Sequence, residues 1–166
     1  FDYSEYSGYL NFFTGDRNLK FTATSAASAL IDTTLNVQDG KSYSVFVING
    51  VDALEPLVVR DSAATPGAGK AMVRFVQLSP DAPTVDLMLE GDTIDLFENA
   101  SFKQATAFKE VDAKMYSFII KNSGSDAVLL SADDIDIRAV GYYTIITRGF
   151  PTPPSGNTNV LSVEVL

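Results

Sequence analysis

The stretch that decides the fold is Met72-Val73-Arg74-Phe75-Val76-Gln77-Leu78. Val73 and Phe75 would lie on one face of a strand and Arg74 on the other, because successive side chains of a strand alternate between its faces. The same period recurs in short segments bounded by turn residues: 19–23, 35–37, 43–48, 57–60, 85–90, 116–121, 134–138 and 161–166. No long segment has a convincing helical period. The sequence therefore predicts an all-β protein, either a sandwich or a barrel.

The chain also repeats itself at an offset of 99 to 100 residues. The strand positions that match are Leu19 and Phe21 with Phe118 and Ile120, Leu35 and Val37 with Ile135 and Ile137, and Tyr43 and Val45 with Tyr143 and Ile145. Matches in several strands at a nearly constant offset indicate a duplication. We therefore expect two tandem immunoglobulin-like antiparallel β-sandwich repeats.

The two repeats differ in completeness. Residues 61–69 are small and contain Pro66, Gly67 and Gly69, which is typical of a linker, so we expect a partial first repeat at 1–66 and a complete second repeat at 67–166. In this register residue 1 falls opposite Ala100, so residues 70–99 have no counterpart in the first repeat. The first repeat should thus lack its initial strands in this chain. The missing strands would come from the upstream chain or from another chain, because a sandwich without them has open edges.

Composition excludes several classes of function. The net charge of −9 and the lack of a basic cluster argue against binding to nucleic acid or to anionic lipid. Neither cysteine nor histidine occurs, which removes disulfides, zinc–thiolate sites, thiol nucleophiles and the commonest general base. We therefore expect no enzyme, and we assign no catalytic, cofactor-binding or metal-ligating residue and no cofactor.

Two groups of carboxylates are candidates for sites. A calcium ion could be held by Asp126, Asp133, Asp134 and Asp136. A glycosidase-like pair could be formed by Glu90 and Asp92. The first group lacks the spacing of a calcium-binding EF-hand loop, and a solvated acidic edge that blocks strand pairing is the favoured interpretation. The second group has no flanking apolar cleft to separate two carboxyl pKa values.

Two other motifs have a structural interpretation beside a functional one. In the segment 79–83 (Ser-Pro-Asp-Ala-Pro), prolines that fix φ and an aspartate that caps a tight turn explain the residues without a ligand. The densest aromatic stretch lies at the beginning of the chain: Phe1, Tyr3, Tyr6, Tyr9, Phe12 and Phe13. We favour packing of these rings against the missing strands. The alternative is ligand contact by Tyr3, Tyr6 and Tyr9, since such rings can stack on sugars or anchor a protein partner.

The segment 71–87, AMVRFVQLSPDAPTVDL, resembles the signature of the bacterial family called domain of unknown function 4397. In that family a V-R-F/V-V-N strand runs into S-P-D-A-P and then V-D-L/V. Residues 39–46 are similar to its G-K-x-Y-T strand and residues 6–10 to its Y-x-x-S-x-Y-L element. The second repeat departs from the pattern at Lys114 and Val140, where turn glycines are expected. The resemblance implies a secreted or surface-anchored β-sandwich, often a lipoprotein of Gram-negative bacteria, with no established activity.

Together these features predict a non-enzymatic surface module that acts as a spacer or an adhesion domain. The alternative is a glycan- or peptide-binding protein that uses the N-terminal aromatics. A partner would be a protein or glycan at the cell surface, and membrane attachment would occur only through a lipid anchor upstream of this chain. We expect an extracellular or outer-membrane location, with the periplasmic side left open.

Overall fold

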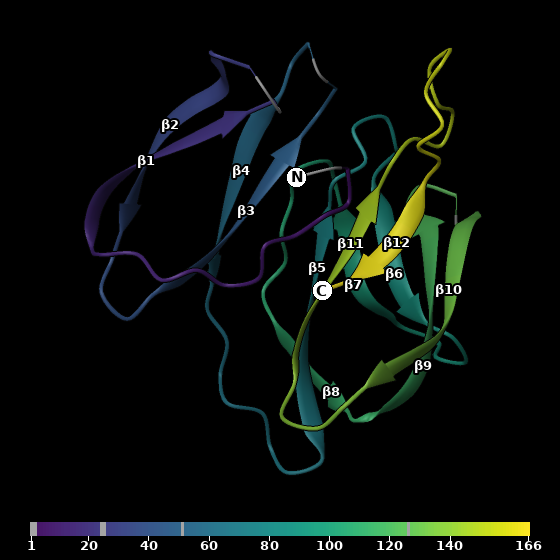
Figure 1. Ribbon diagram of the computed structural model, residues 1–166. Helices are drawn as coiled ribbons and strands as arrows, with labels where there is room; N and C mark the ends of the chain where they lie inside the picture. The colour runs from purple at the N-terminus through teal and green to yellow at the C-terminus, as the bar shows by residue number, and fades with distance from the viewer. Residues whose placement is uncertain (1–2, 24–25, 51, 126) are drawn as a thin grey trace. The chain divides into compact units, whose positions relative to one another are not determined.

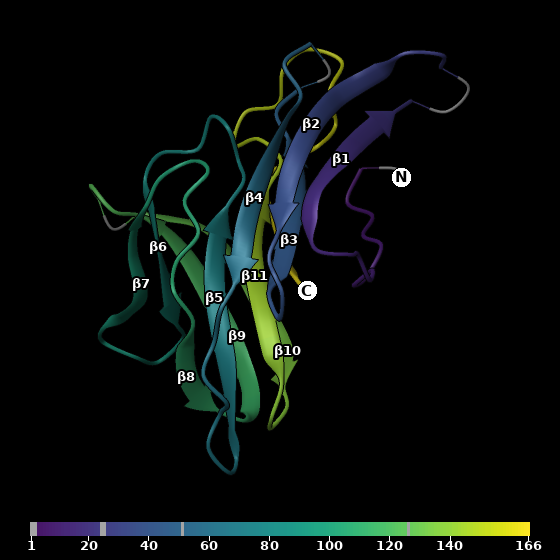
Figure 2. The same cartoon turned by 90° about the vertical axis from the view of Figure 1, so that its left-hand side faces the viewer.

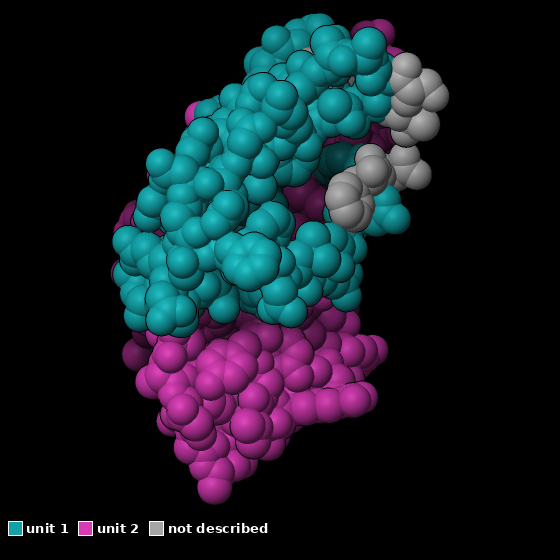
Figure 3. Space-filling model, turned by 60° about the vertical axis from the view of Figure 1, so that its left-hand side comes forward, with its two compact units in different colours: residues 1–61 teal, residues 62–166 magenta. Residues whose placement is uncertain are grey.

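The computed structural model describes residues 3–23, 26–50, 52–125 and 127–166. These residues form twelve strands and no helix, so the described chain has no helix that could cross a membrane. The chain divides into two compact units, residues 1–61 and 62–166, which are coloured separately in Figure 3. The predicted linker at residues 61–69 spans this division. The all-β fold with tandem repeats is confirmed.

Unit 2 is a sandwich of two four-stranded sheets (Figure 1). One sheet has the order β10-β9-β6-β7 and the other β12-β11-β5-β8. The strands are β5 (Lys70–Gln77), β6 (Val85–Leu89), β7 (Asp95–Ala100), β8 (Lys109–Asp112), β9 (Lys114–Asn122), β10 (Val128–Ile137), β11 (Tyr142–Arg148) and β12 (Ser162–Val165). Neighbouring strands are antiparallel except β5 and β11, which run parallel from Met72↔Tyr142 to Gln77↔Thr147.

The core of unit 2 lies between the two sheets. Val73 and Phe75 of β5, which the alternation assigned to one face, are buried there together with Ile145 of β11. Phe118 and Ile120 of β9 fill the opposite side and are also fully buried. The period-two pattern therefore predicts the inward face because every second side chain of these strands enters the space between the sheets.

Unit 1 consists of two hairpins. β1 (Gly15–Thr22) pairs with β2 (Ala29–Val37), and β3 (Ser42–Ile48) pairs with β4 (Glu55–Asp61). β1 and β2 correspond in sequence to β9 and β10, and β3 begins and ends 100 positions before β11. The repeat seen in the sequence is thus a repeat of strands.

The backbone conformation repeats as well. Left-handed φ values occur at three matched pairs of turn positions: Ser4 (70°) and Lys103 (70°), Gly40 (62°) and Val140 (65°), and Asn49 (71°) and Gly149 (77°). Val140 keeps the turn although its β-branched side chain disfavours this conformation by about 1–3 kcal/mol. Its amide donates to the Lys70 carbonyl at 2.7 Å, which holds the turn against the first residue of β5.

Unit 1 lacks part of the sandwich that unit 2 contains. In its described residues, counterparts of β9, β10, β11 and β12 are present, and counterparts of β5, β6 and β7 are not. Residues 10–13, which match β8, form no strand. In unit 2, β8 lies beside β5 and is hydrogen-bonded to it (Figure 2). Without such a neighbour, Leu19 and Val45 are only half-buried, whereas their counterparts Phe118 and Ile145 are fully buried.

This difference predicts unequal effects of the same kind of truncation. Ile145→Ala should lower the free energy of unfolding of unit 2 by about 2–5 kcal/mol, because it leaves a cavity in a filled core. The matched Val45→Ala change should cost unit 1 about 1 kcal/mol or less, since this side chain is only partly buried and the space that it leaves is open to solvent. Urea unfolding followed through NMR signals of each unit measures both effects. Equal losses would contradict the half-open core of unit 1.

Candidate functional site

The aromatic residues proposed as ligand contacts lie outside any strand. Tyr3, Tyr6 and Tyr9 have exposed fractions between 54% and 75%. The Tyr9 hydroxyl donates to the Asp61 carboxylate at 2.6 Å, and the Ser44 hydroxyl donates to the same carboxylate at 3.0 and 3.1 Å. The N-terminal segment is therefore tied to the end of β4, while the tyrosine rings face solvent. Phe1 of this aromatic stretch lies outside the described residues.

The Ser-Pro-Asp-Ala-Pro loop is fixed from within the sandwich. Gln77 is buried, and its Oε1 accepts hydrogen bonds from the Ser79 amide at 2.7 Å and the Thr147 hydroxyl at 2.8 Å. The buried Ser79 hydroxyl donates to the Gly149 carbonyl at 2.6 Å. These bonds join the end of β5 to the end of β11. Asp81, which was expected to cap the turn, is exposed, and the fixing contacts come from Ser79 and Gln77 instead.

Arg74 of β5 lies opposite Thr144 of β11. Its side chain is on the face of the sheet that points away from the sandwich core, as the alternation predicts. It is nevertheless buried. Its Nε donates to the Thr144 hydroxyl at 2.9 Å, and its guanidinium carbon lies 4.8 Å from the centre of the Phe108 ring. An arginine held by a hydroxyl and an aromatic face is stabilised in place, so Arg74 has a structural role in unit 2.

Asp86 was missed by sequence reasoning. Its carboxylate is buried and accepts hydrogen bonds from the Asn99 amide at 2.6 Å and the Ser123 hydroxyl at 2.7 Å. These bonds connect β6 to the end of β7 and to the turn after β9. The signal that could have found it is the acid between Val85 and Leu87 in a segment that is otherwise apolar.

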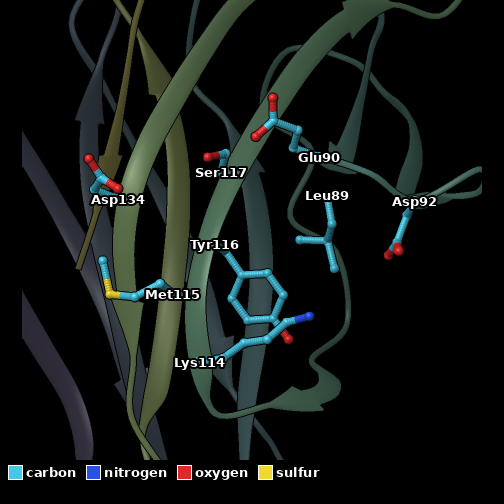
Figure 4. A pocket seen from close by; sticks show the side chains of 8 residues that line it. All are labelled: Leu89, Glu90, Asp92, Lys114, Met115, Tyr116, Ser117 and Asp134. Carbon is cyan, nitrogen blue, oxygen red and sulfur yellow. The ribbon is translucent and has the colours of Figure 1, made fainter.

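One shallow depression of unit 2 is lined by three acids. It has a volume of about 210 Å³, and Figure 4 shows its lining residues: Leu89, Glu90, Asp92, Lys114, Met115, Tyr116, Ser117 and Asp134. The carboxylates of Glu90, Asp92 and Asp134 lie on different sides of it (Figure 4). Among the described residues no three acids are grouped so that they could hold a metal ion, and Asp126 lies outside those residues.

Tyr116 is one of the residues that line this depression. Burial raises the pKa of its phenol, and the negative charges of Asp112 and Asp92 raise the pKa further. Its hydroxyl donates to the Asp112 carbonyl at 2.9 Å. The phenol therefore stays protonated at neutral pH, which is the wrong state for a general base or a nucleophile.

Asp136, another acid of the group considered as a calcium site, forms an ion pair. The Arg138 Nε donates a hydrogen bond of 2.7 Å to its carboxylate, and this hydrogen bond together with the Asp136 charge raises the pKa of the guanidinium. Asp134 has a left-handed φ of 58° at a point where the pairing of β10 with β9 shifts register. Asp134 thus lies at an irregularity of β10, and Asp136 is engaged in an exposed ion pair.

Comparison with known families identifies the chain. A model of the family described as Domain of unknown function (DUF4397) matches residues 1–88 and again residues 71–163. The chain belongs to this family. The two DUF4397 matches overlap over residues 71–88, so most of β5 and β6 lies in both. Among curated proteins, none matches the chain.

The buried loop contacts predict a stability effect. Ser79→Ala should lower the free energy of unfolding by about 1–3 kcal/mol, because it leaves the buried Gly149 carbonyl without this donor. Ser101→Ala is the matched control, since the Ser101 hydroxyl donates to Gln104 Oε1 at an exposed site. Its cost should stay within about 0.5 kcal/mol. Urea titration of both variants provides the comparison, and a Ser79→Ala variant as stable as the control would refute the structural interpretation of the loop.

The raised pKa of Tyr116 predicts a pH dependence. The folded chain keeps the phenol proton to higher pH than the unfolded chain does. The resulting stability is present below about pH 10, the pKa of an unfolded tyrosine, and is lost as pH rises through the folded pKa. Between about pH 8.5 and 11.5, urea unfolding should show a steeper loss of stability for the parent than for Tyr116→Phe. Parallel curves would show that Tyr116 makes no such contribution.

Proposed function

We propose that this DUF4397 chain is a non-enzymatic, secreted or surface-anchored β-sandwich module that acts as a spacer or an adhesion domain. The proposal rests on one observation: the polar residues of the family signature form hydrogen bonds within the sandwich itself. Gln77, Ser79 and Asp86 are buried, and their side chains bond to the loops and strands of their own sandwich. A signature whose polar groups hold loops in place supports a structural module.

The acidic depression supports the same proposal. Catalysis by two carboxylates requires one raised and one normal pKa, which an apolar wall next to one of them would create. Here the acids are spread around a shallow surface, and the tyrosine between them keeps its proton. The proposed surface location rests on the resemblance of residues 71–87 to a signature that implies secreted sandwiches and lipoproteins.

The test is a screen of the purified chain for turnover of chromogenic esters, phosphate esters and glycosides. We expect rates equal to the buffer blank for the parent and for a variant with Glu90→Gln, Asp92→Asn and Asp134→Asn. Turnover by the parent that this triple variant loses would place a hydrolase site in the depression and overturn the proposal. Limited proteolysis of intact producing cells tests the location, since a surface module is digested and an intracellular one is not.

A second candidate function rests on the exposure of Tyr3, Tyr6 and Tyr9. Tyrosine rings offer large contact area at low entropic cost, so this segment suits a glycan or a peptide. A glycan array and a peptide array probed with the parent test it. Binding that is lost in the triple Tyr→Ala variant, but kept by Tyr142→Ala at another exposed tyrosine, would support this function. Binding that survives the triple change would exclude these rings.

A further inference from the structure

The strands that pair with the hairpins of unit 2 indicate which kind of strand could pair with the hairpins of unit 1. In unit 2, each hairpin is joined to the rest of its sheet through its first strand. β9 pairs antiparallel with β6, from Val85↔Asn122 to Leu89↔Phe118, and β11 pairs parallel with β5. These two pairings add β5 and β6 to the two sheets, and the side chains of β5 and β6 then pack into the core between the sheets.

The matching strands of unit 1 have no such neighbour in a sheet. β1 and β3 each belong to a two-stranded sheet, β1 with β2 and β3 with β4, within the described residues. A two-stranded hairpin has only marginal stability by itself, and its open edge can receive a further strand. In unit 2, β6 pairs with one edge of β9 and β5 with one edge of β11. The corresponding edges of β1 and β3 in unit 1 are outer edges of their two-stranded sheets.

Apolar side chains are also exposed in the segment that precedes β1. Leu10, Phe12 and Phe13 are 64%, 53% and 87% exposed. Phe12 corresponds to Val111 of β8, 99 positions later, which is only 8% exposed and lies opposite Ala71 of β5. The segment 10–13 therefore carries an apolar side chain at the position where β8 carries Val111. Among the described residues it has no neighbouring strand equivalent to β5 that would bury this side chain.

We propose that unit 1 is an acceptor for a β-strand segment of the same chemistry as residues 70–99. One strand of this segment would add to β3 in parallel and another to β1 in antiparallel orientation, and residues 10–13 would become a strand against the first. This inference goes beyond the proposed function, because it concerns how the module is completed and not what it does at a surface.

The repeat register sets the side-chain chemistry of this segment. A residue of the Phe75 type would lie beside Val45, just as Phe75 lies beside Ile145 in unit 2. Residues of the Leu87 and Leu89 type would lie beside Phe21 and Leu19.

A second folded copy of this chain does not fit as the donor. In unit 2, β5 is hydrogen-bonded on one edge to β11 and on the other to β8, and β6 is bonded on its two edges to β7 and β9. A copy could donate these strands only by unfolding its own sandwich. The occupant is therefore a segment that is not already part of a closed unit.

The experiment fuses a copy of residues 70–99 directly before Phe1 of the full chain, which continues the register in which residue 1 lies opposite Ala100. Hydrogen exchange of the β1 and β3 amides is then compared with that of the parent. Exchange in the fusion should be at least about a hundredfold slower, because opening of these strands would require opening of a closed sandwich. The control fusion carries Val73→Ser, Phe75→Ser, Val85→Ser and Leu87→Ser in the added copy only.

Protection in the first fusion and not in the control supports the proposal. Exchange as fast as in the parent, or equal protection in both fusions, overturns it. Phe12→Ser provides a second readout. It should lower the melting temperature of unit 1 in the fusion, where Phe12 becomes buried, and leave it unchanged in the parent. The same effect in both proteins would contradict the proposed burial of Phe12.

Discussion

The placement of β5 between β11 and β8 is the constraint on which unit 2 depends. This one strand completes a sheet on both of its edges, and its side chains reach both sides of that sheet. Val73 and Phe75 close the core, Arg74 binds Thr144 on the other face, and Gln77 fixes the loop that follows. A parallel pair cannot be made by a tight turn, so β5 and β11 are joined by a long connection whose strands belong to both sheets.

Unit 1 shows what remains when this constraint is absent. The hairpins and their turns persist, as the shared left-handed φ values of Gly40 and Val140 demonstrate. The full burial of the matched core positions does not persist, because Leu19 and Val45 are only partly buried. Turn geometry is therefore a local property of these sequences, whereas the closed core depends on contacts between residues far apart in the chain.

This division also explains what could be predicted from sequence. The alternation around Phe75 and the duplication predicted the class of fold, the core face of β5 and the incomplete first repeat. β8 was missed because four residues carry too little alternation, and β7 because its sequence, DLFENA, does not alternate between apolar and polar residues. The parallel pairing of β5, the burial of Arg74 and the role of Asp86 depend on partners 13 to 70 residues away, which periodicity does not reveal. The exposure of Tyr3, Tyr6 and Tyr9 became visible only with the structure.

The open edges of β1 and β3 have a consequence for the behaviour of the protein in solution. Exposed strand edges can pair with those of another molecule, and a long-range repulsion between molecules opposes this. The net charge of −9 supplies such a repulsion. Its range is about 10 Å at 0.1 M salt and about 3 Å at 1 M salt. Colloidal stability of this chain should therefore depend on ionic strength, and concentrated salt brings the strand edges of different molecules within pairing distance.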